Sequence, residues 1–130
     1  MKIGVPKEIK SQENRIGLTP ESVKILTSNG NDVMVENNGG FEAGFYNEQY
    51  KSAGAKIFDK AEDIFDDAEI IVKVKEPQPS EVKMIKENQI VFTYLHLAAA
   101  KELTKGLVDS KSVCIAYETV TDNNLSLIHI

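Results

Sequence analysis

Short runs of β-branched residues alternate along this chain with segments whose apolar residues recur at helical spacing. The alternation strongly constrains the fold, because strands separated by helices need crossover connections, and such connections favour a parallel sheet. The predicted strands cover residues 2–6, 32–36, 70–75, 90–95 and 112–117, with a weaker pattern at 55–58. We therefore predict an α/β fold, a mostly parallel sheet with helices on both faces.

Capping residues place helices between these strands. Thr19 is a typical N-cap, Pro20 suits the first helical position, and Gly30 follows the last apolar residue of the segment. The other predicted helices cover residues 47–53, 61–67, 81–87 with Ser80 as N-cap, and 100–109. Each helix then connects two strands of one sheet.

The length and composition are those of a soluble globular protein. A chain of 130 residues forms one domain or a piece of one, and 42% hydrophobic residues suffice for a core. The net charge of -5 disfavours the phosphate backbone of nucleic acids as a partner. The longest apolar stretch, residues 90–100, is too short for a membrane span, and Cys114 has no partner for an internal disulfide. We predict a cytoplasmic protein with no membrane segment.

The loop of residues 36–45 contains three glycines and is the one long irregular piece of the pattern. Glycines let backbone amides approach an anion, so a phosphate site is one interpretation. The spacing matches neither the G-x-G-x-x-G pattern nor the Walker pattern. We therefore expect an ordinary structural loop that follows a strand.

Three basic side chains lie at or just beyond predicted strand ends, namely Lys73, Lys75 and His96. In open α/β sheets, ligands bind outside the carboxyl ends of the strands, so these residues are candidates for a site. The alternative for the two lysines is a strand end that reaches water, with the aliphatic stems lying along the apolar surface. That alternative is stronger for Lys73 than for Lys75.

His96 and Arg15 each have a structural and a functional interpretation. His96 is followed by small alanines that leave space around its ring, and an imidazole carries a proton near neutral pH, but a lone histidine also serves as a structural hydrogen bonder. Arg15 lies between the first strand and the first helix, and its guanidinium can hold a carboxylate with two parallel bonds. An exposed surface arginine is the alternative.

Five separated stretches, in this order, resemble the family of alanine dehydrogenases and nicotinamide nucleotide transhydrogenase α-subunits. They are MKIGVPKEIKSQENRIGLTPESV, FEAGF, IIVKVKEPQPSE, FTYLHLAAAKELT and VCIAYETV, and together they extend from Met1 to about Asp122. Transhydrogenase chains generally lack the lysine and the histidine that stand here at Lys75 and His96. The resemblance therefore favours the alanine dehydrogenase branch, which implies reversible oxidation of L-alanine with NAD to pyruvate and ammonia.

The resemblance also implies roles for individual residues. Arg15 is expected to hold the substrate carboxylate, Lys75 to bind the same end of the substrate, and His96 to act as acid and base at the reacting carbon. Glu118, in the AYETV stretch, is expected to be structural. The resemblance implies no metal and no cofactor-binding residue within these 130 residues.

In that family the chain continues into a separate NAD-binding domain, so residues 1–124 are expected to be the N-terminal part of the substrate-binding domain, inactive alone. Residues 125–130, including His129, are expected to be a truncated or foreign tail. The full-length protein is expected to be a homo-oligomer, a hexamer in the family.

Two alternatives remain open at this point. Besides the alanine dehydrogenase interpretation, one alternative is a fragment of a transhydrogenase α-subunit. The other is a stand-alone module that binds small carboxylates.

Overall fold

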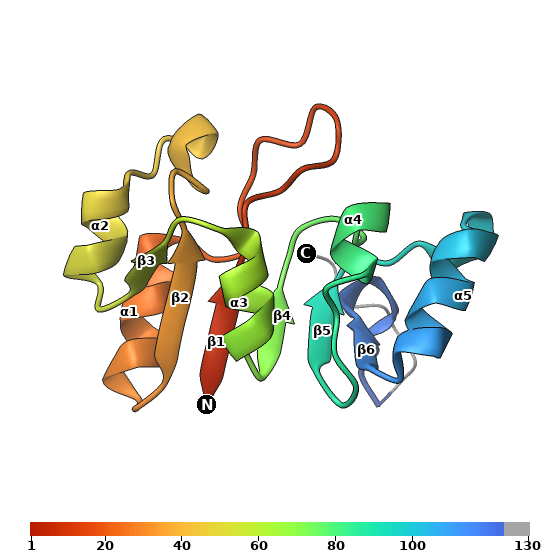
Figure 1. Ribbon diagram of the computed structural model, residues 1–130. Coiled ribbons are helices and arrows are strands. Elements are labelled where there is room, and N and C mark those ends of the chain that lie inside the picture. The colour runs from red at the N-terminus through yellow and green to blue at the C-terminus, as the bar shows by residue number, and fades with distance from the viewer. Residues whose placement is uncertain (124–130) are drawn as a thin grey trace.

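The computed structural model describes residues 1–123, and these contain a six-stranded, fully parallel sheet with the strand order β3-β2-β1-β4-β5-β6 (Figure 1). The strands are β1 (Lys2–Val5), β2 (Asp32–Glu36), β3 (Lys56–Phe58), β4 (Ile70–Val72), β5 (Ile90–Thr93) and β6 (Val113–Ala116). Each predicted strand is present, shortened by up to three residues at its ends. The predicted α/β class and parallel sheet are confirmed.

Five α-helices and three short 3-10 helices connect the strands within the described residues. The α-helices are α1 (Pro20–Ser28), α2 (Asn47–Ser52), α3 (Ala61–Asp67), α4 (Pro79–Val82) and α5 (Lys101–Ser110). The 3-10 helices are η1 (Phe41–Ala43), η2 (Leu97–Ala99) and η3 (Tyr117–Thr119). At α1 the predicted cap is present, since the Thr19 hydroxyl accepts a hydrogen bond from the Ser22 amide at 3.2 Å and Pro20 takes the first helical position.

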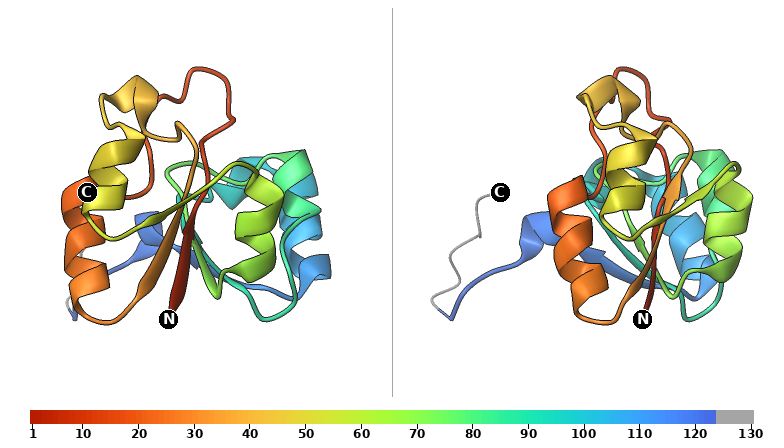
Figure 2. Two further views of the ribbon diagram at one scale, coloured as in Figure 1. Left: turned by 60° about the vertical axis from the view of Figure 1, so that its left-hand side comes forward. Right: turned by 90° about the vertical axis from the view of Figure 1, so that its left-hand side faces the viewer.

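The helices cover both faces of the sheet, as Figure 2 shows for α1 on one side and α3 and α5 on the other. The core between the sheet and α1 and α2 is centred on Val5, Val23 and Tyr50. The second core, under α3, α4 and α5, is centred on Ile64, Ile71 and Val91. Alternate residues of the central strands enter opposite cores, as in β2, where Val33 and Val35 enter the first core and Met34 the second.

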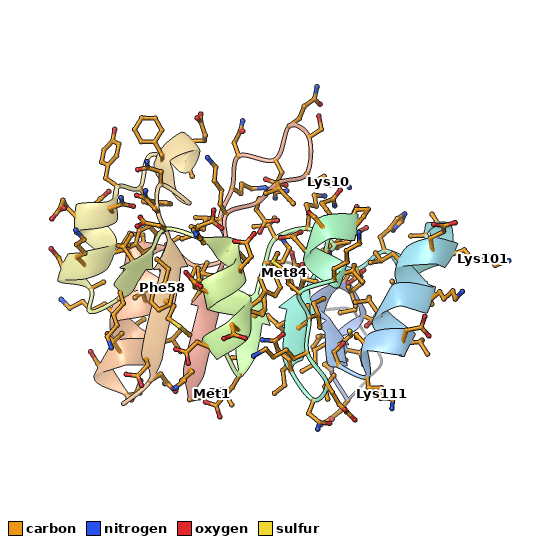
Figure 3. All side chains as sticks on the ribbon, in the orientation of Figure 1. Met1, Lys10, Phe58, Met84, Lys101 and Lys111 are labelled. Carbon is orange, nitrogen blue, oxygen red and sulfur yellow. The ribbon has the colours of Figure 1, made fainter. Side chains whose placement is uncertain are left out.

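All six strands end at the same edge of the sheet, which is the upper edge in Figures 1 and 3. In Figure 3, Lys10 lies above this carboxyl edge, whereas Met1 and Lys111 lie at the opposite edge. The strand order reverses between β1 and β4, because the chain proceeds from β1 toward β3 on one side and from β4 toward β6 on the other. Such a switch point opens a crevice at the carboxyl edge, where ligands bind in open α/β sheets.

Helix α4 differs from the prediction in its start and its length. Pro79, not a residue after Ser80, takes the first helical position, which makes Gln78 the N-cap. The Glu81 carboxylate then accepts a hydrogen bond from the Gln78 amide at 2.9 Å. The helix stops at Val82, and the amides of Met84 and Ile85 bond three residues back instead of four, so the remaining residues form turns.

The glycine-rich loop after β2 has packing reasons for its glycines. A Cβ at Gly40 would lie 2.9 Å from the buried Tyr50 ring, and one at Gly39 would lie 2.9 Å from the Glu36 carbonyl oxygen. Gly44 has φ 86°, a conformation that side chains rarely adopt. Packing and backbone conformation thus account for the three glycines of this loop.

Among residues 1–123, no helix has both the length and the apolar character that crossing a bilayer requires. The predicted tail of residues 125–130 lies outside the described residues.

Candidate functional site

Lys75 and His96 come together at the carboxyl edge around one aromatic ring, that of Tyr94. The ammonium of Lys75 lies 5.0 Å from the centroid of the Tyr94 ring. The imidazole of His96 is stacked on the same ring, with centroids 5.7 Å apart and planes 12° apart, and its Nδ1 lies 3.1 Å from the Tyr94 hydroxyl. Tyr94 therefore links the two predicted site residues, through a cation–π contact with Lys75 and through stacking and a hydrogen bond with His96.

His96 owes its position to an unusual backbone conformation. Strand β5 ends at Thr93, and His96 lies in the left-handed region with φ 48° and ψ 47° immediately before η2. The side chain is exposed at the edge of the sheet. The sequence predicted a strand up to Leu95 with His96 directly after it, which is correct for the location but gave no indication of the left-handed turn.

Glu118, just after β6, contacts the backbone of this turn. Its carboxylate accepts the Leu95 amide at 3.1 and 3.0 Å and the His96 amide at 2.6 Å. Partial burial works against ionisation of Glu118, but the amide hydrogen bonds outweigh it and hold the pKa of this carboxyl below its usual range. Glu118 thus fixes the backbone of the turn that carries His96.

Arg15 is exposed at the rim of the site, in the connection between β1 and α1. Its Nε and Nη2 donate to the two carboxylate oxygens of Glu13 at 2.9 and 2.7 Å. This two-pronged pair is the main reason why the pKa of Glu13 falls to about 2, and the nearby Lys75 ammonium makes a smaller contribution to the same decrease. Arg15 is thereby connected to Lys75 through Glu13, and it already holds a carboxylate in the geometry that a small carboxylic acid would adopt.

A cleft of about 440 Å³ opens beside Arg15, between the β1–α1 connection and the ends of β4 to β6. Its walls include Val72, Phe92 and Tyr117, so it is mostly apolar with the guanidinium at one side. The Tyr117 hydroxyl donates to the Val74 carbonyl oxygen, and burial raises the pKa of this phenol. An apolar cleft with a few polar groups at its rim is the usual form of a small-molecule site.

Lys73 is not a solvent-reaching strand end, and that part of the prediction is wrong. Strand β4 stops at Val72, and the Lys73 side chain is only 1% exposed. Its ammonium lies 3.1 Å from a Glu8 oxygen and 3.1 Å from a Glu81 oxygen. Two buried carboxylates thus compensate the buried cation, a pairing of distant residues that the local sequence does not reveal.

Glu8 also holds the backbone that leads to Lys75. The amides of Val74 and Lys75 donate to its two carboxylate oxygens at 3.1 and 3.0 Å. On the other side, the Lys75 carbonyl oxygen accepts a hydrogen bond from the Thr93 hydroxyl at 2.8 Å. Hydrogen bonds with Glu8, just after β1, and with Thr93 in β5 therefore fix the segment after β4. The backbone position of Lys75 is well defined as a result.

Three residues of this site were missed in the sequence. Tyr94 lies two positions before His96, so alternation places both on one side and was an available signal. Glu8 follows β1 in the KEIK stretch, at the same edge as the other candidates. Glu13 had no signal, because its partner Arg15 is two residues away in an irregular loop.

Comparison with known proteins identifies close relatives for nearly the whole chain. The family model described as "Alanine dehydrogenase/PNT, N-terminal domain" matches residues 4–128. An alanine dehydrogenase of Halomonas elongata is 51% identical over 121 residues, covering 93% of this chain and 33% of the relative. An alanine dehydrogenase of Bacillus subtilis is 51% identical over 122 residues, covering 94% of this chain and 32% of the relative.

Solved structures show the same pattern. An L-alanine dehydrogenase superposes with a TM-score of 0.95 at 50% identity, with 98% of this chain and 35% of that chain covered. A transhydrogenase from Sinorhizobium meliloti superposes with a TM-score of 0.85 at 27% identity, with 92% of this chain and 35% of that chain covered. The chain therefore spans about a third of the length of the relatives that it matches.

Proposed function

The chain belongs to the alanine dehydrogenase/PNT N-terminal domain family, and from this premise we propose that residues 1–124 form the N-terminal part of the substrate-binding domain of an NAD-dependent alanine dehydrogenase. The reaction is the reversible oxidation of L-alanine to pyruvate and ammonia. Alanine dehydrogenases at about 50% identity support this function, whereas the transhydrogenase is a more distant match.

The observation that carries the proposal is that Lys75 and His96 both contact the Tyr94 ring, while Arg15 is linked to Lys75 through the Glu13 carboxylate. Two cations and one imidazole at the carboxyl edge suit a substrate with a fixed carboxylate and a carbon at which protons must move. The mostly apolar cleft beside Arg15 suits a methyl side chain better than a charged one.

In the proposed mechanism each residue has a separate task. Arg15 holds the substrate carboxylate with two parallel hydrogen bonds. Lys75 binds the same end and polarises the developing carbonyl oxygen. His96 removes a proton from the water that attacks the oxidised α-carbon, and it returns a proton to the amino group that leaves as ammonia. Because Nδ1 of His96 contacts the Tyr94 hydroxyl, Nε2 is the nitrogen left for these transfers.

The described residues do not fit an NAD site. A dinucleotide pyrophosphate is held by a glycine-rich turn at the start of a helix, and the β1–α1 connection carries charged side chains instead. We propose that NAD is bound by a part of the polypeptide outside this chain. The active protein is proposed to be a cytoplasmic homo-oligomer whose substrates are alanine and pyruvate.

The test is alanine-dependent reduction of NAD by the polypeptide that continues this chain through its own downstream coding sequence. His96→Ala is expected to lower kcat by about 100-fold or more, because general acid–base catalysis contributes about that much. Lys75→Ala is expected to lower kcat/KM through both substrate binding and polarisation.

Lys105→Ala is the matched control, because this exposed lysine of α5 has no part in the site. Binding of NADH, measured by the change in its nicotinamide fluorescence, should be unchanged in all variants. Wild-type activity in either site variant would show that the replaced residue has no part in the reaction. An inactive wild type that still binds NAD would contradict the proposed substrate.

A further inference from the structure

The backbone at Leu95 and His96 forms a small anion-binding hollow. His96 is left-handed, which costs a residue with a side chain about 1–2 kcal/mol. In this conformation its amide and that of Leu95 point to the same side, and successive amides arranged in this way bind anions. The bound anion here is the carboxylate of Glu118, with three contacts between 2.6 and 3.1 Å.

The carboxylate comes from a different strand exit, 22 residues further along the chain. Glu118 lies in η3, directly after β6, and β6 is the strand next to β5 in the sheet. The sheet therefore fixes the carboxylate independently of the turn that it binds. Without it, two amides at the end of β5 would lose their partner, and the strain at His96 would no longer be offset by these hydrogen bonds.

The imidazole position depends on this backbone. With φ at 48°, the ring of His96 folds back over Tyr94, where Nδ1 meets the hydroxyl. A return of His96 to an ordinary negative φ would turn its side chain away from the Tyr94 ring. We propose that Glu118 is a positioning residue for the reaction, because it locks the left-handed turn that keeps His96 on Tyr94 with Nε2 directed to the substrate; this inference rests on the proposed role of His96.

The kinetic test compares Glu118→Ala, Glu118→Gln and the control Glu87→Gln in the polypeptide extended through its downstream sequence. Glu87 is exposed and precedes β5, at the opposite edge of the sheet. Glu118→Ala is expected to lower kcat by about 10- to 100-fold with KM changed much less, since misplacement of a catalytic group by about 1 Å has effects of that size. Glu118→Gln keeps one acceptor oxygen, so its kcat should lie between those of Glu118→Ala and the wild type.

A second measurement reads the turn itself and does not need activity. With ¹⁵N-labelled histidine, the backbone amide signal of His96, identified by its loss in His96→Gln, should lie downfield in the wild type. It should move upfield in Glu118→Gln and further in Glu118→Ala, because a charge-assisted hydrogen bond is lost. The signals of the control should not move.

Two results would overturn the proposal. One is a kcat per folded molecule in both Glu118 variants that equals that of Glu87→Gln, which would leave Glu118 with stability alone. The other is an unchanged His96 amide signal in both variants. An inactive wild type would refute the proposed function, and the amide signal would then decide by itself whether Glu118 holds His96 in place.

Discussion

Two glutamates at the carboxyl edge have the same task at neighbouring strand exits. Glu8 accepts the amides of Val74 and Lys75, and Glu118 accepts those of Leu95 and His96. In each case the second amide belongs to a residue whose side chain is a candidate for the chemistry. A carboxylate that binds two successive amides fixes the local backbone. The Cα atoms of Lys75 and His96, from which the candidate side chains extend, are therefore held in place.

Replacement of Lys73 by methionine is expected to destabilise the fold by about 3–5 kcal/mol at neutral pH, because Glu8 and Glu81 would then be buried without a counter-ion. Urea unfolding measures the change. Lys51→Met, which removes only an exposed ion pair with Glu48, should cost less than about 1 kcal/mol. Equal losses in the two variants would contradict the buried cluster.

The loss caused by Lys73→Met is expected to shrink toward acidic pH. Burial raises the pKa of Glu81, and Lys73 counteracts the increase. Without the lysine the folded protein binds a proton that the unfolded chain has already released, so stability falls as pH rises above the ordinary carboxyl value. Unfolding at pH 5 and pH 8 tests this, and a loss that is larger at pH 5 would refute it.

Glu13 competes with the substrate for Arg15 in the proposed site. Its carboxylate is bound to the Nε and Nη2 side of the guanidinium and, with its pKa at about 2, stays ionised at any working pH. Glu13→Gln is expected to lower KM for alanine by about two- to fivefold, the range of a modest ion pair, since the Arg15 side chain is 66% exposed although that of Glu13 is only 7% exposed. The value of kcat should not change, and a higher KM would show that Glu13 orients Arg15 instead.

At the scale of elements, sequence patterns predicted the strands and the longer helices, because alternation and caps are local signals. The start and length of helix α4 were predicted wrongly. The helix begins at Pro79, and its buried Glu81 pairs with Lys73 just after β4. Lys75 and His96 were placed at the correct edge of the sheet. Tyr94 was not assigned although it lies only two residues before His96. Glu8 was not assigned, and the amides that Glu118 binds were not foreseen, because strand order alone brings these carboxylates to their partners.

The Tyr50 side chain anchors helix α2 to the segment just before α1. Tyr50 is buried, and its hydroxyl donates to the Leu18 carbonyl oxygen at 2.8 Å. Tyr50→Phe is expected to destabilise the fold by about 1 kcal/mol at pH 7, since one buried hydrogen bond is lost. Urea unfolding would measure this, and a stability equal to that of the wild type would contradict the anchoring role.

The same variant changes the alkaline behaviour. Burial raises the pKa of Tyr50 to about 12, so the folded protein keeps a proton that the unfolded chain loses near pH 10. A raised pKa in the folded state means that this part of the stability is present below pH 10 and is lost toward pH 12, up to about 2–3 kcal/mol. The stability difference between wild type and Tyr50→Phe should therefore decrease from pH 9 to pH 11. A constant difference would show that Tyr50 ionises as easily in the folded protein.

At the scale of the whole molecule, one half of a sheet face lacks a helix among residues 1–123. Helices α1 and α2 pack over β1 and β2, whereas on the same side of β6 Val113 is 48% and Ile115 40% exposed. These two residues are in register with Ile90 and Phe92 of β5, so the apolar surface continues across neighbouring strands. Exposed apolar surface of this extent promotes association.

The 130-residue chain is therefore expected to self-associate within the range of about 1 µM to 1 mM in which exposed apolar surfaces aggregate. The double variant Val113→Thr with Ile115→Thr keeps β-branched residues in β6 and replaces a methyl and an ethyl group by hydroxyl groups, so it should shift the association to higher concentration without unfolding the sheet. Sedimentation velocity at several concentrations measures the effect. Val108→Thr is the control, because Val108 is 71% exposed on α5 and lies outside this sheet face. A wild-type chain that stays monomeric throughout, or a double variant that associates as strongly as the control, would show that this face is not what makes the chain associate.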